Sequence, residues 1–148
     1  MGDKKSSKNI VSVVSKKIKF STKADCDIVN ITDQVRSVVE KSGLSEGVLT
    51  ISHAGATGAV TTMEYEPGCV KDMKDWFEKH VPEGNYEHNR YHQDGNGHSH
   101  LRASLVGPSV SVPFSDGTPV LGTWQSIVFI DFDVRARQRE LVVQLVGI

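Results

Sequence analysis

Apolar and polar residues alternate over several stretches of the chain, which is the spacing of half-buried strands. Near the N-terminus Ile18 and Phe20 alternate with lysines, and further on Val110, Val112 and Phe114 alternate with serine and proline. Other short runs are rich in β-branched residues, which favour extended backbone. Together these patterns predict strands over residues 10–20, 47–51, 59–64, 109–114, 120–132 and 140–146.

A helix is predicted after the first strand, where the apolar spacing changes. Val35, Val38 and Val39 recur at helical intervals, and Thr32 stands just before them as a residue type that caps helix N-termini. Gly43 follows the last apolar position and is typical of a helix C-terminus. We therefore expect one amphipathic helix between Thr32 and Gly43.

A second helix is predicted over residues 70–80. Its apolar residues Val70, Met73, Trp76 and Phe77 fall on one face of a helix. We expect Trp76 and Phe77 to anchor this helix to a sheet.

The order of the predicted elements indicates the fold class. Strand, helix, two strands, helix and a mostly antiparallel β half predict an α+β fold, a single compact domain with an antiparallel-rich sheet and helices packed on one face. Residues 1–9 read as a flexible polar leader, and residues 10–148 form the domain.

Composition and charge exclude several functions. The chain has 148 residues, is 38% hydrophobic and carries a formal net charge of −1. A near-neutral domain lacks the basic footprint of a nucleic-acid-binding protein, so no nucleic-acid partner is expected. The longest apolar run, residues 127–130, is far shorter than the roughly 20 residues needed to cross a bilayer, so no membrane association is expected. Two cysteines without CxxC spacing, and no apolar signal segment, favour a cytoplasmic location.

Histidines gather in one part of the chain. Of the six histidines, five lie between positions 80 and 100, and only His53 lies outside. His92, His98 and His100 are interleaved with Asp94, and imidazole with carboxylate is a ligand set for zinc and similar divalent ions. The cluster therefore indicates a candidate metal site.

The local structure of residues 97–106 decides what this cluster can do. In a strand, His98 and His100 would share one face and could bind one ion. In a helix they would point apart, His98 and Arg102 would share a face, and Asn96 and Gly97 would present free amide groups for an anion such as phosphate. We favour the helix, because Asn96 can cap it and a Gly-Pro pair follows it.

Three ordered blocks of the sequence resemble a known family. They are residues 95–103 (GNGHSHLRA), 105–109 (LVGPS) and 121–125 (LGTWQ), followed by the C-terminal run 141–147 (LVVQLVG). This combination resembles the YjbQ-like family, also called the secondary thiamine-phosphate synthase family. The resemblance implies a compact α+β fold, a homotrimer, a histidine-rich metal site and a weak thiamine-phosphate synthase activity.

The reaction that the resemblance implies suits the candidate residues, and its chemistry suggests a role for each of them. The synthase reaction joins a pyrimidine-methyl diphosphate to a thiazole phosphate, and its leaving group needs positive charge nearby. A divalent ion, zinc or magnesium, would be the cofactor, and the partner would be a small phosphorylated ligand. The expected metal ligands are His92, His98, His100 and Glu64. The expected phosphate-binding residues are Asn96, Gly97 and Arg102, and the expected catalytic residues are Asp94, Arg102 and Gln125.

One departure from the family pattern concerns His53. Many members have a His-Thr-Thr-Ala run before the strand that ends at Glu64, whereas this chain has Gly-Ala-Thr-Gly there and His53 stands two residues out of step. No family role is therefore assigned to His53. Two alternative functions stay open: a non-catalytic protein that binds a metal or a phosphorylated ligand, and a metal-dependent hydrolase.

Overall fold

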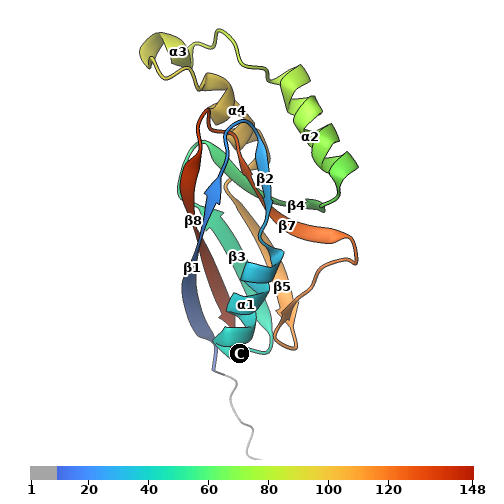
Figure 1. Ribbon diagram of the computed structural model, residues 1–148. Helices are drawn as coiled ribbons and strands as arrows, with labels where there is room; N and C mark the ends of the chain where they lie inside the picture. Colours follow the sequence, from blue (N-terminus) through green and yellow to red (C-terminus); the bar gives the residue numbers. More distant parts are fainter. Residues whose placement is uncertain (1–9) are drawn as a thin grey trace, which may run out of the picture.

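The structure is a computed structural model that describes residues 10–148, so the predicted leader 1–9 lies outside the described residues (Figure 1). The strands are β1 (Ser12–Thr22), β2 (Asp27–Asn30), β3 (Gly47–His53), β4 (Gly58–Glu64), β5 (Ser109–Ser115), β6 (Thr118–Pro119), β7 (Gln125–Asp131) and β8 (Arg137–Gly147). The helices are α1 (Thr32–Ser42), α2 (Pro67–His80), α3 (His88–Tyr91) and α4 (Gly97–Val106).

The strands form two antiparallel sheets. The larger sheet has five strands in the order β1-β8-β3-β5-β6, and the smaller has three in the order β2-β7-β4. Every strand pair is antiparallel, and β1 and β8 pair along their full length. The predicted class, a single α+β domain rich in antiparallel strands, is confirmed, with two sheets where one was expected.

The main core fills the space between the two sheets and α1. Val35 and Val39 on α1 are fully buried, as are Leu49 and Leu145 on the larger sheet. Phe129 of the smaller sheet belongs to the same cluster. The valine spacing that predicted α1 is thus the face that the helix buries.

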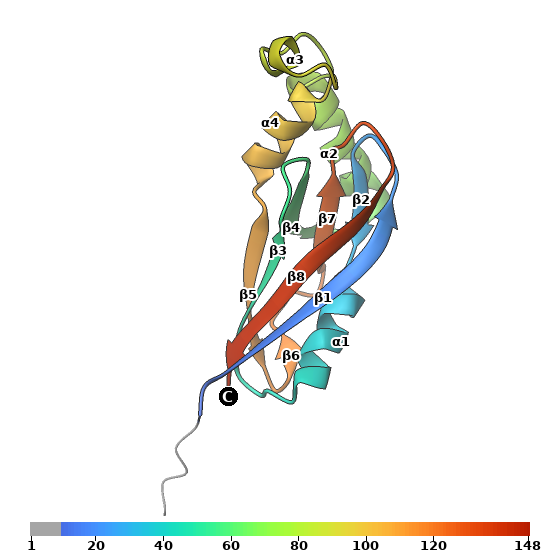
Figure 2. The same cartoon turned by 90° about the vertical axis from the view of Figure 1, so that its left-hand side faces the viewer.

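Strand β7 is buried on both of its faces. Ile127 and Phe129 face the main core, whereas Val128 and Ile130 pack in a second cluster. Phe77 of α2 belongs to that second cluster. The continuous apolar run of β7 follows from its central place, because a strand covered on both sides has no polar face. Figure 2 shows the larger sheet with its outer face uncovered by helices.

Three short elements and one helix start differ from the sequence prediction. β2, β6 and α3 were not predicted, and residues 120–124, expected in a strand, precede β7. Thr32 is not a cap but the first residue of α1, and the Asn30 side chain accepts hydrogen bonds from the Thr32 backbone N–H at 3.0 Å and its hydroxyl at 2.6 Å. The Thr32 hydroxyl also accepts from the Ile127 N–H at 2.9 Å, which ties the start of α1 to β7.

Helix α2 begins earlier than the apolar spacing predicted. Pro67 occupies its first turn, and the Glu66 side chain accepts hydrogen bonds from the Gly68 and Cys69 backbone N–H groups. With 14 residues, α2 is shorter than a bilayer span requires. Within residues 10–148, no helix has the length and apolar character to cross a membrane.

The predicted anchor of α2 is correct for one of its two aromatic residues. Phe77 is 2% exposed and meets Phe132 edge to face at 4.7 Å between ring centroids. Trp76 is 48% exposed and stacks on His80 of the same helix. Trp76 lies at the margin of the apolar face, so the helix turns it outward.

Truncation of Phe77 tests the packing of α2. Phe77→Ala should lower the free energy of unfolding by about 3–5 kcal/mol, because it removes a buried ring and leaves a cavity. Trp76→Ala serves as the matched control and should cost about 1 kcal/mol or less. Urea denaturation measures both, and equal losses in the two variants would contradict the orientation of α2.

Candidate functional site

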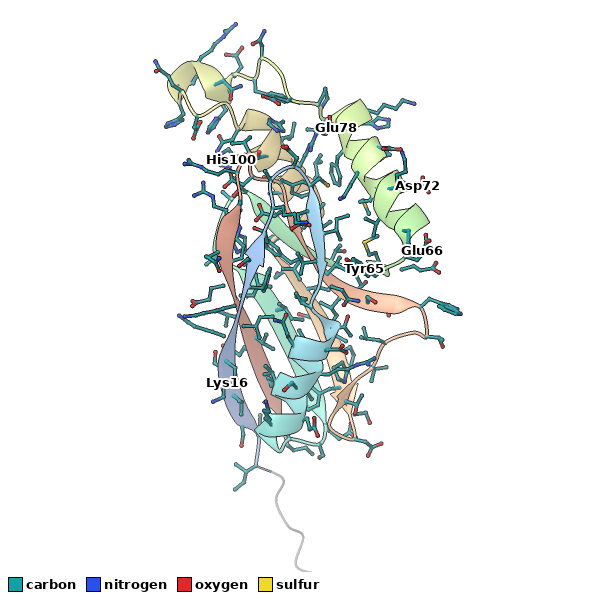
Figure 3. The ribbon with its side chains drawn as sticks, viewed as in Figure 1. Lys16, Tyr65, Glu66, Asp72, Glu78 and His100 are labelled. Carbon is teal, nitrogen blue, oxygen red and sulfur yellow. The ribbon has the colours of Figure 1, made fainter. Side chains whose placement is uncertain are left out.

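Five histidines, His53, His88, His92, His98 and His100, gather at the end of the molecule that carries α3 and α4; we call them the histidine cluster. The His53 side chain comes from the last residue of β3, and the others come from α3, the segment after it and α4. Figure 1 shows α3 and α4 together at this end, and Figure 3 labels His100 there. The β3–β4 turn links His53 to the other histidines, because Gly55 lies against the His53 ring and the Ala56 carbonyl contacts His100.

Residues 97–106 form a helix, which confirms the favoured prediction. Gly97 is the first residue of α4, and the Asn89 side chain accepts a hydrogen bond from its backbone N–H at 3.0 Å. Gly95 has a φ of 67°, the left-handed conformation that glycine adopts without strain. A Cβ at Gly97 would lie 2.6 Å from Tyr86 Cβ, so this close approach requires glycine. Asn96 is 8% exposed, and its Oδ1 has no hydrogen-bond partner among the described residues.

The two histidines of α4 point in different directions. His98 is 3% exposed and lies toward Tyr86 and Arg102, whereas the His100 Nδ1 is 2.9 Å from the Ala56 carbonyl oxygen. Residues two apart are about 200° apart around a helix axis, so His98 and His100 do not face one ion. A carbonyl oxygen only accepts hydrogen bonds, so His100 Nδ1 carries the proton and donates a hydrogen bond to the Ala56 carbonyl.

Arg102 is a structural tether between α4 and α2. Its guanidinium is 2% exposed, and it donates to the Val81 carbonyl at 2.8 Å and to the Glu78 carboxylate at 2.9 Å. A third hydrogen bond goes to the Phe77 carbonyl at 3.4 Å. These acceptors belong to the C-terminal end of α2, where a positive charge is favourable. The guanidinium is therefore committed to α2, and its predicted role toward phosphate has no support in this geometry.

The remaining imidazoles lie in contact with one another. The His88 ring centroid is 4.6 Å from that of His100 and 4.9 Å from that of His92. Asp94 Oδ1 is 3.8 Å from His88 Nδ1, a distance beyond a hydrogen bond. Asp94, predicted to be catalytic, is thus beside the cluster and exposed.

His53 is the buried member of the cluster that comes from a β-strand. It is 7% exposed, and neither ring nitrogen has a hydrogen-bond partner among the described residues. The ring meets Phe129 edge to face at 5.0 Å. The turn between β3 and β4 covers it, because a Cβ built on Gly55 would lie 2.5 Å from His53 Nε2. Gly55 permits this approach.

Burial sets the protonation of two histidines. Desolvation and then the charge of Arg139 lower the pKa of His53, and desolvation and then Arg102 lower the pKa of His98. Both shifts favour the uncharged ring. At neutral pH each ring therefore offers one N–H donor and one nitrogen acceptor.

A buried ion-pair network holds the β3–β4 turn over His53. Arg139 on β8 donates to both carboxylate oxygens of Asp131 at 2.6 and 2.7 Å, and to the Thr57 hydroxyl at 3.0 Å. Asp133 accepts from Arg137 at 2.7 Å. Burial acts to raise the pKa of Asp133, but the Arg137 hydrogen bond and neighbouring groups outweigh it, so the pKa is lowered.

A small cavity of about 200 Å³ lies between the β3–β4 turn and α4. It is lined by Gly55, Ala56, Gly58, Ala103, Ser104 and Pro108. Gly55 and Gly58 separate it from the His53 ring, and Ala56 connects it to His100. Among the described residues no histidine lines the cavity itself, and the β3–β4 turn lies between it and the rings of His53 and His100.

Glu64 and Gln125 lie at the other end of β4. They pair with each other across β4 and β7, while Gly58 at the cluster end pairs with Asp131. Six strand intervals of about 3.3 Å separate the two ends by about 20 Å. The fold therefore does not bring the predicted metal ligand Glu64, or the predicted catalytic Gln125, to the histidine cluster.

The prediction of a metal-binding protein is wrong. Across residues 10–148, no group of three or more histidine, cysteine, aspartate or glutamate side chains is placed to hold a metal ion. The helical geometry of α4 and the distance to Glu64 are the physical reasons. The sequence analysis did not identify three residues that form or support the cluster, namely His53, Asn89 and Arg139. His53 stood out only as the histidine outside the dense segment.

Fold and site together define a class: two-sheet α+β proteins with a histidine cluster where a short helix and the β3–β4 turn meet. The family profile described as "UPF0047 protein YjbQ-like" matches residues 16–148. The chain belongs to the YjbQ/UPF0047 family. A UPF0047 protein of Methanothermobacter thermautotrophicus is 35% identical over 138 residues, covering 93% of this chain and 94% of that protein. One from Archaeoglobus fulgidus is 39% identical over 117 residues, covering 78% and 89%.

Solved structures have the same fold. A crystal structure described as a YbjQ-like protein of unknown function from Sulfolobus solfataricus has a TM-score of 0.88 and 31% identity, and the match covers 94% of this chain and 100% of that one. An uncharacterized YjbQ/UPF0047 protein from Clostridium acetobutylicum has a TM-score of 0.77 and 33% identity, with 86% and 98% covered.

These relatives also correct the predicted activity. Neither the family description nor these relatives' names state a thiamine-phosphate synthase or any other transferase, and the Sulfolobus protein is described as having no known function. The predicted synthase mechanism also needs a bound divalent ion, and in the described part of the chain no set of side chains is placed to hold one. The prediction of a thiamine-phosphate synthase is wrong.

The lowered pKa of His53 predicts a pH-dependent stability. Below the ordinary histidine pKa of about 6.5, the unfolded chain binds protons that the folded chain does not, so the free energy of unfolding falls as pH decreases. Urea denaturation between about pH 7.5 and about pH 5.5 should show this loss. His53→Gln should reduce the slope, because it removes one of the buried imidazoles.

The control for this experiment is His80→Gln. His80 is exposed on α2, and its Nδ1 lies 2.9 Å from the Trp76 carbonyl oxygen. This variant should keep the pH slope of the natural protein. An unchanged slope in His53→Gln would contradict the assignment of the pH dependence to His53.

Proposed function

We propose that the protein binds a small polar ligand at the histidine cluster. One observation carries the proposal. In residues 10–148, every buried side-chain nitrogen or oxygen without a hydrogen-bond partner belongs to the cluster or to the start of α4. These atoms are His53 Nδ1 and Nε2, His88 Nδ1, His98 Nδ1, Asn96 Oδ1 and Ser99 Oγ.

The energetic cost of these atoms supports a functional role. A buried polar group without a partner costs about 1–3 kcal/mol, and native proteins satisfy nearly all such groups. Elsewhere in the described residues even buried charged groups have hydrogen-bond partners, as Arg102 and Arg139 illustrate. Unsatisfied groups confined to one end of the fold are what a site for a hydrogen-bonding ligand would leave in the free protein.

The chemistry of the cluster limits the ligand. Neutral imidazoles donate one hydrogen bond and accept another, so the ligand carries a group able to do both, such as a hydroxyl or a partly protonated oxyanion. The adjoining cavity of about 200 Å³ suits a small molecule. The small phosphorylated ligand expected from the resemblance remains a proposal. Its phosphate would accept from imidazole N–H groups, since Arg102 is committed to α2.

Phosphate titration of the histidine rings tests this proposal. In ¹H–¹⁵N NMR spectra of the side chains, inorganic phosphate should shift the ring signals of His53 or His100 saturably. Gly55→Ala should weaken the response, because its new Cβ would displace the His53 ring. Gly84→Ala is the matched control, since its Cβ would meet only Tyr86, at 3.9 Å.

Two outcomes would count against the proposal. A response that rises linearly with phosphate reports only ionic strength, and an equal response in the Gly55 and Gly84 variants places the binding elsewhere. A polyol such as glycerol, titrated in the same way, separates a hydroxyl-binding site from a phosphate-binding site.

We also propose a cytoplasmic homotrimer, on the strength of the resemblance and of an apolar row on the larger sheet. Val13, Val146, Val48 and Pro113 are exposed and lie opposite one another across β1, β8, β3 and β5. Exposed apolar rows of this kind are typical of protein–protein contacts. A second copy of the chain would cover the row.

Light scattering tests the trimer. The natural chain should give three times the mass of one chain, and Val146→Lys should lower that mass by placing a charge in the contact. Leu105→Lys is the control, because Leu105 is also exposed but belongs to α4, outside the row. A monomer mass for the natural chain would remove the proposal.

A further inference from the structure

A second hollow lies at the opposite end of β4, away from the histidine cluster. It is a groove of about 380 Å³ between the end of β4 and the segment that leads into β7. Glu64 and Trp124 both line it. Figure 1 shows β7 and the chain before it projecting from the body of the fold, and Figure 3 labels Tyr65, which follows Glu64, at this end.

Hydrogen bonds fix the segment that carries Trp124. The Gln125 side chain donates to the Thr62 hydroxyl at 3.0 Å and accepts from the Gly122 backbone N–H at 3.1 Å. The Gln125 backbone N–H also donates to the Gly122 carbonyl at 3.0 Å. Gln125 therefore joins both sides of the groove, and the groove is preformed.

The two groups at the mouth of the groove are complementary to a cation. Trp124 is 74% exposed, although tryptophan is usually well covered in a folded chain. Glu64 is exposed, and no ion pair within residues 10–148 includes its carboxylate. An indole face attracts cations through its quadrupole, and a carboxylate attracts them through its charge.

We propose that this groove is a binding site for a small organic cation, such as a quaternary or alkylated ammonium group. The cation lies against the Trp124 ring with the Glu64 carboxylate as its counter-charge. A neutral ligand of the same shape loses both attractions, and an anion is repelled by Glu64. The groove lies about 20 Å from the histidine cluster, so the two sites are independent.

Choline and its neutral isostere 3,3-dimethyl-1-butanol provide the test, because they differ in charge but hardly in shape. Isothermal titration calorimetry and ¹H NMR of the full chain should show saturable choline binding in the millimolar range. The neutral alcohol should bind at least about fivefold more weakly, as expected for loss of a cation–π contact and a counter-charge.

Matched variants assign the site. Glu64→Gln and Trp124→Leu should each weaken choline binding by about fivefold. Asp72→Asn removes an exposed carboxylate from α2 and Trp76→Leu removes the other partly exposed indole, and both should leave choline binding unchanged.

Three results would overturn the proposal. One is the absence of saturable choline binding, the second is equal affinity for choline and the neutral alcohol, and the third is unchanged affinity in Glu64→Gln. Phosphate binding at the histidine cluster is measured on different residues, so either site can fail without the other.

Discussion

The bidentate pair between Arg139 and Asp131 is the interaction on which the rest of this structure depends. Arg139 belongs to the larger sheet and Asp131 ends the central strand of the smaller one, and their side chains are only 11% and 0% exposed. Removing one partner of such a buried pair costs about 3–5 kcal/mol, because the other charge is left uncompensated. The Thr22 and Thr57 hydroxyls contact the same pair, so it joins β1, the β3–β4 turn and both sheets.

The position of the histidine cluster follows from this network and from one further tether. The network fixes the turn whose glycine covers His53, and Arg102 fixes α4 against the end of α2. The two arginines are buried and fully engaged, while the imidazoles between them keep unpartnered nitrogens. Residues whose hydrogen bonds are satisfied thus hold in place imidazoles whose nitrogens lack partners. This is the arrangement expected of a preorganised binding site. The cost of these groups in stability is offset by the packing of the two-sheet core.

Sequence reasoning succeeded where the signal was periodic and local. The valines of α1 and the Gly-Pro end of α4 predicted both helices, and the alternation near Ile18 predicted β1. The site was harder to predict, because its geometry depends on long-range contacts. The Asn89 cap of Gly97, the approach of Gly55 to His53 and the Glu78 partner of Arg102 link residues that no spacing relates. The shared direction of His98 and Arg102 followed from the helix alone and is confirmed.

A fragment-soaked crystal structure at high resolution tests the central claim most directly. The claim is that the unpartnered ring nitrogens of His53, His88 and His98 form a site for a small polar ligand. Small hydroxyl- and phosphate-bearing compounds should then appear within hydrogen-bond distance of at least one of these rings. Compounds bound only elsewhere on the molecule, or rings found fully hydrogen-bonded to protein groups in the free crystal, would contradict it.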